Sequence, residues 1–186
     1  MPITIAGSGT ITGLSAGGLP AGSVTSATLA SGAGGKILQV VQNHVSEKLY
    51  VDCATESFGS FSELNTSITP ASGSKVLIQG WLNVGASAGM TVFIKLRRGS
   101  TDLSIADAAG SRRRGTASGN VISVSGSQAV PFSFLDASPG GDGSTTINYK
   151  LQWAINSGTA YLGQSSPVSI IQRAGGIQFY VMEIGA

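Results

Sequence analysis

Side chains able to support nucleophilic or acid–base catalysis are few in this chain of 186 residues, which holds one histidine and one cysteine. A nucleophilic centre would have to join His44 to Cys53 or Asp52, because such a centre places a nucleophile beside a general base. No recognisable motif flanks these residues. We therefore interpret His44 as a structural or surface histidine and Cys53 as a small buried apolar residue within a strand.

Metal and cofactor sites find equally little support in the sequence. One cysteine and one histidine cannot build a zinc cluster. The run 136–143 lacks the alternating oxygen ligands and terminal glutamate of a calcium loop, and no lysine of a phosphate loop follows Gly7-Ser8-Gly9. We expect a non-enzymatic chain without catalytic residues, metal or cofactor.

Nine acidic residues are the candidates for the carboxylate pair of a glycosidase, which spans a cleft of about 5–9 Å. Such enzymes usually add a long groove with several aromatic platforms, whereas this chain has two Trp and four Tyr. A carbohydrate-active domain stays as the second functional class, with a lectin favoured over an enzyme. The nine residues are Glu47, Asp52, Glu56, Glu63, Asp102, Asp107, Asp136, Asp142 and Glu183.

Five of the eleven cations are clustered, as Arg97-Arg98 and as the run Arg112, Arg113 and Arg114. One interpretation of the run is a loop for an anionic partner such as lipopolysaccharide, an acidic particle surface or nucleic acid. The other is a solvated loop, or one paired with Asp102 and Asp107. Nucleic acid itself is not expected, because the net charge is only +2 and no aromatic residues are interleaved with the arginines.

The composition is that of a folded chain with an unusually uncharged surface. Charged residues make up 11% of the chain, against about 25% in an ordinary domain, while 41% are hydrophobic. Disordered chains show the opposite balance. Because surface charge normally keeps proteins apart, this composition indicates a protein packed against neighbours. No apolar run of about 18 residues is present, so we expect no membrane insertion.

Residues 1–35 differ from the rest because they contain no Asp, Glu, Lys, Arg or His and nine glycines. We expect an extended arm, docked on its own domain or on a partner chain, and favour a role as the attachment element. An uncharged arm desolvates no ion when it docks. Its apolar side chains are isolated and suit separate pockets; they are Ile3, Ile5, Ile11, Leu14, Leu19, Val24 and Leu29.

Residues 36–186 show period-two alternation and turn signals, which predict an all-β domain. We expect an antiparallel β-sandwich of jelly-roll-like form. Trp81 lies one residue out of phase with Leu82, which places it away from the core. The expected strands are Ile37–Val45, Lys48–Cys53, Leu64–Ile68, Lys75–Val84, Thr91–Arg97, Asp102–Ile105, Val121–Val124, Val130–Leu135, Thr145–Ile155, Thr159–Leu162 and Ile177–Ile184.

Several short segments, in this order, resemble the tail-fibre and virion structural proteins of bacteriophages, notably phages of aquatic bacteria. Each segment is weak by itself, and their shared order across nearly the whole chain carries the resemblance. They lie at residues 9–30, 35–41, 67–70, 74–78, 110–114, 134–136, 148–152 and 182–184.

The resemblance implies a homotrimeric, β-rich virion protein that is made in the host bacterial cytoplasm and carries no enzyme activity. Its implied partners are its own copies, other tail or capsid proteins, and a host surface glycan. Phage fibres are often longer and carry an extended shaft, whereas this chain has one short arm. The expectation is therefore a short tail fibre, with a capsid decoration (cement) protein as the alternative.

Overall fold

The computed structural model describes residues 37–46, 49–51, 58–86, 89–121, 126–163 and 176–186. The arm predicted over residues 1–35, with its seven apolar residues, lies outside this part of the chain, as do Asp52 and Cys53. The described residues form eleven strands and no helix, so they contain no helix long and apolar enough to cross a membrane.

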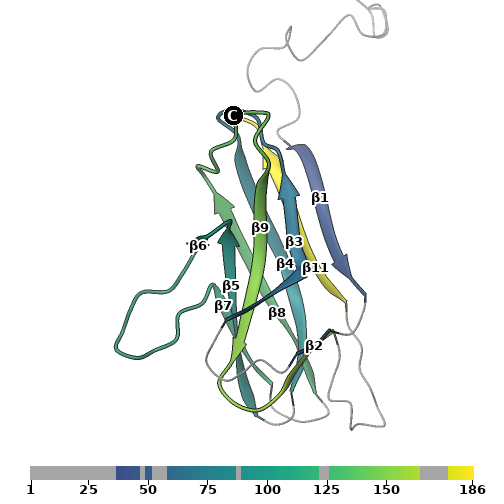
Figure 1. The fold of residues 1–186 in the computed structure, drawn as a ribbon, viewed down its shortest axis with the longest axis vertical. Coiled ribbons are helices and arrows are strands. Elements are labelled where there is room, and N and C mark those ends of the chain that lie inside the picture. The colour runs from purple at the N-terminus through teal and green to yellow at the C-terminus, as the bar shows by residue number, and fades with distance from the viewer. Residues whose placement is uncertain (1–36, 47–48, 52–57, 87–88, 122–125, 164–175) are drawn as a thin grey trace, which may run out of the picture. The chain divides into compact units, whose positions relative to one another are not determined.

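All strand pairs are antiparallel, and the strands form two sheets (Figure 1). Sheet A contains β1 (Ile37–Val45), β2 (Leu49–Val51), β4 (Lys75–Ala86), β8 (Ser127–Asp136), β10 (Ala160–Leu162) and β11 (Ile177–Ile184). Sheet B contains β3 (Gly59–Ile68), β5 (Met90–Arg98), β6 (Thr101–Leu103), β7 (Ala117–Val121) and β9 (Ile147–Ile155).

The connectivity is that of a jelly roll once the short strands are joined to their neighbours. β10 and β11 pair with one edge of β4 at different heights, and β6 and β7 share one edge of β5. Counting β1 with β2, β6 with β7, and β10 with β11 leaves eight strands along the chain. Numbered along the chain, these eight are β1/β2, β3, β4, β5, β6/β7, β8, β9 and β10/β11. Their order across the sheets is then 1-8-3-6 in sheet A and 2-7-4-5 in sheet B. The predicted all-β sandwich of jelly-roll-like form is confirmed.

The inner faces of the two sheets supply one apolar core. β5 alternates strictly between buried and half-buried residues, as the period-two pattern requires. Trp153, Tyr149 and Phe179 are the largest fully buried side chains. Trp81 is 39% exposed on sheet A whereas Trp153 is fully buried, so the predicted outward position of Trp81 is confirmed.

β7 begins earlier than the strand that the sequence predicts here. A strand was expected over Val121–Val124, but β7 spans Ala117–Val121, and residues 122–125 lie outside the described part. The segment has small polar residues and no apolar alternation, so its pattern gave no signal. Gly119 is needed there, because a Cβ atom at this position would lie 2.7 Å from the Cγ2 atom of Val130 on β8.

The strand predicted over Asp102–Ile105 ends early, at Leu103. Ser104 has a φ of 50°, a left-handed conformation that breaks the pleat. The preceding turn is tight: Gly99, with a φ of 56°, begins the two-residue connection between Arg98 and Thr101.

A buried carboxylate joins the two sheets. Asp136, on β8 of sheet A, accepts hydrogen bonds from Arg98 Nη1 at 2.8 and 3.0 Å and from the Tyr149 hydroxyl at 2.7 Å, both in sheet B. Burial, together with the hydrogen bond to Asp136, raises the pKa of Tyr149. Tyr149 therefore stays neutral and acts as a donor to Asp136.

A second buried carboxylate, Glu183 on β11, fixes the loop that leads into β4. It accepts hydrogen bonds from Gln39 Nε2 at 2.6 Å and from the backbone amide of Ala71 at 2.8 Å. Burial by itself raises the pKa of Glu183, but the hydrogen bonds from Gln39, Ser74 and Ala71 lower the pKa on balance. The charged form is thus the one that the fold stabilises.

Candidate functional site

Of the three residues considered for nucleophilic catalysis, the structure describes only His44. It lies exposed near the end of β1, on the outer face of sheet A. Within the described ranges, no group of three or more His, Cys, Asp or Glu side chains is placed to hold a metal ion. The candidate binding features of the described surface are its charged side chains and its exposed apolar side chains.

The arginine run lies in the loop of residues 104–116, which stands out from the sandwich between β6 and β7 (Figure 1). The base of this loop is fixed by backbone hydrogen bonds from Ala106 to Gly115 and from Thr116 to Ile94. The Thr116 hydroxyl adds a bond to the Leu103 carbonyl at 2.9 Å. The loop is thus held at its base on sheet B.

Arg113 points back onto sheet B and anchors the loop. Its Nη1 atom donates to the Ile155 carbonyl at 2.6 Å, and its guanidinium lies 5.1 Å from the centre of the Phe93 ring. Ala154, although on the outer face of β9, is fully buried beneath this region, where it pairs with Phe93. Arg113 therefore has a positioning role as well as a charge.

Arg112 and Arg114 donate to backbone carbonyls of the loop itself. Arg114 Nε bonds to the Ala106 carbonyl at 2.6 Å, and Arg112 Nη2 reaches the Asp107 carbonyl at 3.4 Å. Both side chains belong to exposed residues. A neutral carbonyl does not cancel a guanidinium charge, so both arginines keep their full attraction for an anion.

Asp102 is engaged elsewhere. Its carboxylate forms ion pairs with Lys95 Nζ at 3.0 Å and with Arg97 Nε at 2.7 Å. In the part of the chain that the structure describes, no ion pair joins a carboxylate to Arg112, Arg113 or Arg114. Among the described residues, neither Asp102 nor Asp107 thus forms an ion pair with the arginine run.

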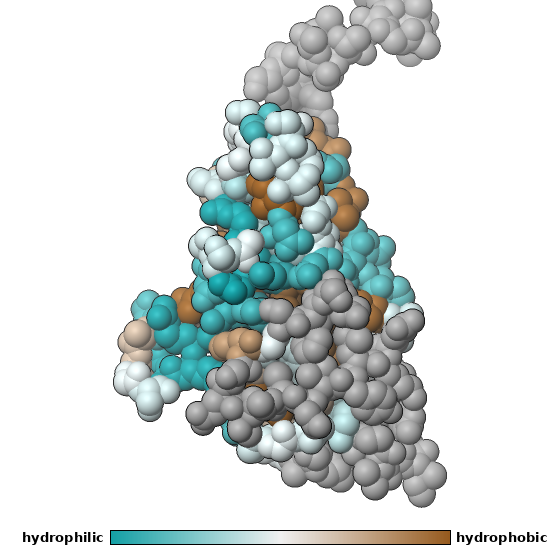
Figure 2. All heavy atoms as spheres, viewed as in Figure 1, coloured by the Kyte–Doolittle hydropathy of each residue, from teal (hydrophilic) through white to brown (hydrophobic). Residues whose placement is uncertain are grey.

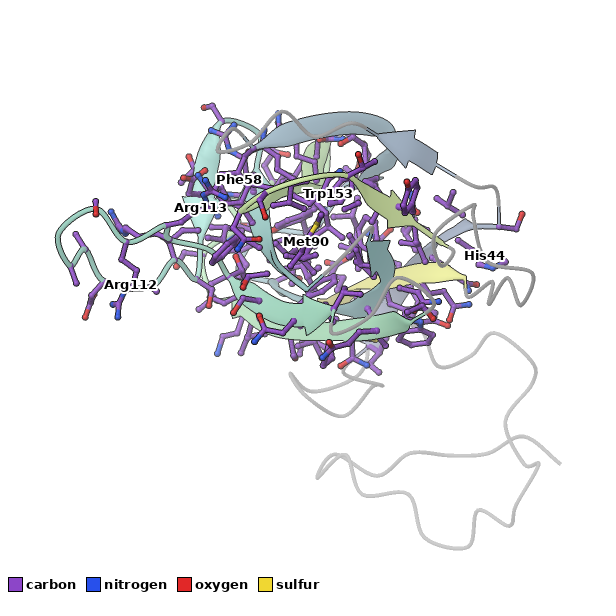
Figure 3. The ribbon with its side chains drawn as sticks, turned by 90° about the horizontal axis from the view of Figure 1, so that it is seen from below. His44, Phe58, Met90, Arg112, Arg113 and Trp153 are labelled. Atoms are coloured by element: carbon purple, nitrogen blue, oxygen red, sulfur yellow. The ribbon has the colours of Figure 1, made fainter. Side chains whose placement is uncertain are left out.

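Two open hollows flank the loop. The first, which we call the Lys95 hollow, measures about 340 Å³ and is lined by Phe58, Lys95, Asp102, Ile105, Arg112 and Arg114. The second, the Phe93 hollow, measures about 330 Å³ and lies beside Phe93, Arg112 and Arg113. Arg112 lines both. Figure 3 shows Arg112 on the projecting loop, with Arg113 and Phe58 close to the body of the sandwich.

A different surface covers the outer face of sheet A. The pairing register aligns one outward side chain from each of four adjacent strands. We call this set the apolar row; it consists of Val40, Met182, Leu77 and Leu135. Val40 is 54% exposed and Leu135 46%, while the two central residues are half-buried.

Further apolar residues border this row. Ile37 and Leu38 are exposed at the start of β1, and apolar surface is visible along this edge of the molecule (Figure 2). Trp81 lies beside a shallow hollow of about 280 Å³ that Tyr180 and Phe132 also line. On the described strands of sheet A, the outward positions carry one Lys, at position 75, and no Asp, Glu or Arg. The face thus carries little charge, and the apolar row runs across it.

The sequence analysis did not identify the apolar row, although a signal for it exists. Each of its members follows or precedes an inward apolar residue, as in Val40-Val41 and Val181-Met182. Such doublets break the alternation of a strand with one solvated face. Pairing register was needed to show that the outward members share one line across the sheet.

No protein-family model matches the chain, and no curated protein is significantly similar to it.

Proposed function

We propose that this protein is a non-enzymatic structural protein on the surface of a phage particle, acting as a short trimeric fibre-like adhesion module. Residues 1–35 are its attachment element in this proposal. The observation that carries it is the neutral outer face of sheet A with its apolar row. Jelly-roll domains are common in viral capsids and lectins, which agrees with this role.

The apolar row is costly to leave in water. Half-exposed Val40 and Leu135, together with Ile37 and Leu38, form the kind of continuous patch that marks an interaction site. Each such side chain contributes about 1.5–3 kcal/mol when fully buried. With a single lysine at one end, the face offers almost no charge that association would have to desolvate.

The edge of sheet A points to the same conclusion. In the described part of the chain, β1 pairs with β11 on one side and with no strand on the other. Free edge strands are usually protected by lysine or proline, and β1 contains neither in ILQVVQNHV. Closed cyclic symmetry would bury this edge and the apolar row without open-ended growth, which supports a trimer over a chain of copies.

The arm supports attachment through its composition. It joins the domain directly before β1, and its lack of charge lets it enter a groove on another protein without desolvating ions. Deleting residues 1–30 is expected to leave a folded domain that no longer joins the particle. A truncated protein that is incorporated normally would contradict the attachment role.

Quantitative mass spectrometry of purified phage particles tests the proposed function. We expect the chain in tens of copies per particle, in multiples of three. Hundreds of copies would instead assign it to capsid decoration, and its absence from particles would overturn the proposal.

A further inference from the structure

We propose that the Lys95 hollow binds a carboxylated sugar unit of an acidic polysaccharide. This inference rests on the adhesion role proposed above and names the class of ligand. Three observations support it: the charge around the hollow, the side chains that line it, and the Phe93 hollow on the other side of Arg112.

The positive charge of the protein is concentrated here. Lys95, Arg97 and the run 112–114 supply five cations, and the acids nearby are Asp102 and Asp107. Five cations less two acids leave a net charge of +3, whereas the whole chain has +2. The hollow therefore lies in a region whose charge attracts an anion.

The lining fits a carboxylate with a hydroxylated ring attached. Arg112 and Arg114 face the hollow with guanidinium groups that pair geometrically with a carboxylate. Asp102 has each oxygen in one ion pair, and a carboxylate accepts about four hydrogen bonds, so capacity remains for hydroxyl donors.

The hollow also offers an apolar wall. Phe58 and Ile105 line it, and Lys95 Nζ lies 4.2 Å from the centre of the Phe58 ring. A sugar ring presents both C–H groups and hydroxyls, so it matches a lining that combines an aromatic ring with polar groups. A bare inorganic anion would leave the apolar wall unused.

The neighbouring Phe93 hollow extends the argument to a polymer. It repeats the pairing of an aromatic ring with arginines and shares Arg112 with the Lys95 hollow. Two hollows of about 340 and 330 Å³ on either side of one arginine suit successive units of a chain. Single-stranded DNA brings no ring hydroxyls for the acceptor positions that remain on Asp102, so a hydroxylated acidic sugar is the better match.

Four polymers of matched chemistry separate the contributions. They are polygalacturonate, its methyl ester, poly-L-glutamate and single-stranded oligo(dT). Binding to the purified full chain is measured by biolayer interferometry at physiological salt. We expect polygalacturonate to bind at least about tenfold more tightly than the other three, because only it presents both carboxylates and sugar hydroxyls. Equal or tighter binding of poly-L-glutamate or oligo(dT), or no binding of polygalacturonate, would overturn the proposal.

Arg112→Gln is the most specific variant, because Arg112 is exposed and its side chain makes one hydrogen bond to the described residues, of 3.4 Å to the Asp107 carbonyl. We expect about tenfold weaker binding of polygalacturonate, as for the loss of one charge-assisted contact, with an unchanged melting temperature. Lys75→Gln is the matched control, since it removes the same charge from sheet A. Equal losses in both variants would show unspecific attraction and contradict the proposal.

The outcome is separable from that of the proposed function. Particles that contain the protein, combined with a purified chain that ignores polygalacturonate, would overturn the ligand alone. Selective binding by a chain that is absent from particles would overturn the particle role alone.

Discussion

The outer face of sheet A carries the apolar row, whereas the outer face of sheet B carries Lys150, Arg97 and Lys95. The inner faces of the two sheets are alike, since both supply aliphatic and aromatic residues to one core. The difference therefore lies in residues that the sandwich does not need for its own folding. It agrees with the division of labour that we propose, in which sheet A would associate with copies of the chain and sheet B would meet an anionic ligand.

The two tryptophans give the largest expected contrast between core and outer face. Trp153→Ala should lower the free energy of unfolding by about 3–5 kcal/mol, because it empties a fully buried site. Trp81→Ala should cost less, about 1–2 kcal/mol, because Trp81 lies partly in solvent on sheet A. Urea unfolding followed by circular dichroism measures both, and similar losses would contradict the assignment of the two faces.

Asp136 tests whether the two faces belong to one rigid sandwich. Asp136→Ala should lower the free energy of unfolding by about 2–4 kcal/mol, because it leaves Arg98 and Tyr149 without their shared partner. Tyr149→Phe removes one donor only and should cost about 1 kcal/mol. A loss for Asp136→Ala below about 1 kcal/mol would contradict the role of Asp136 in joining the sheets.

Glu183 gives the smallest effect, and one that depends on pH. Its pKa is lowered in the folded chain from the usual 4.5, so its contribution to stability is complete above that pH. The contribution falls as the pH drops through the lowered pKa, because protonation then costs the hydrogen bonds from Gln39 and Ala71. Glu183→Gln should destabilise the protein at pH 7 by about 1 kcal/mol, and the difference from the natural chain should shrink towards pH 3. A difference that is independent of pH would contradict this account.

Strands were predictable where apolar alternation and turn residues agreed. β1 and β11 have the predicted bounds, Ile37–Val45 and Ile177–Ile184, because each is a run rich in apolar and β-branched residues that follows a pair of glycines. The start of β7 was missed because Gly119 and its small neighbours carry no pattern, and the strand is defined by its pairing with β5. Pairing depends on residues far apart in the chain, which a local pattern does not contain.

The candidate sites show the same limit. The arginine run was visible as a cluster of charge, but the sequence did not show that Arg113 bonds to the Ile155 carbonyl while Arg112 lines two hollows. Nor did it show that Asp102 is held by Lys95 and Arg97. These contacts depend on which strands pair and in which register. The local sequence therefore revealed the charged cluster, but not that Arg113 anchors the loop while Arg112 lines the two hollows.

Association through the outer face of sheet A is the central claim, and the solution mass of the protein tests it most directly. Light scattering coupled to size exclusion should give three times the chain mass of 18.7 kDa for the natural protein. Leu135→Asp places a charge in the apolar row and should give a folded monomer, whereas Ser118→Asp on sheet B should remain trimeric. A natural protein that is monomeric at micromolar concentration, or a Leu135→Asp variant that stays trimeric, would contradict the account.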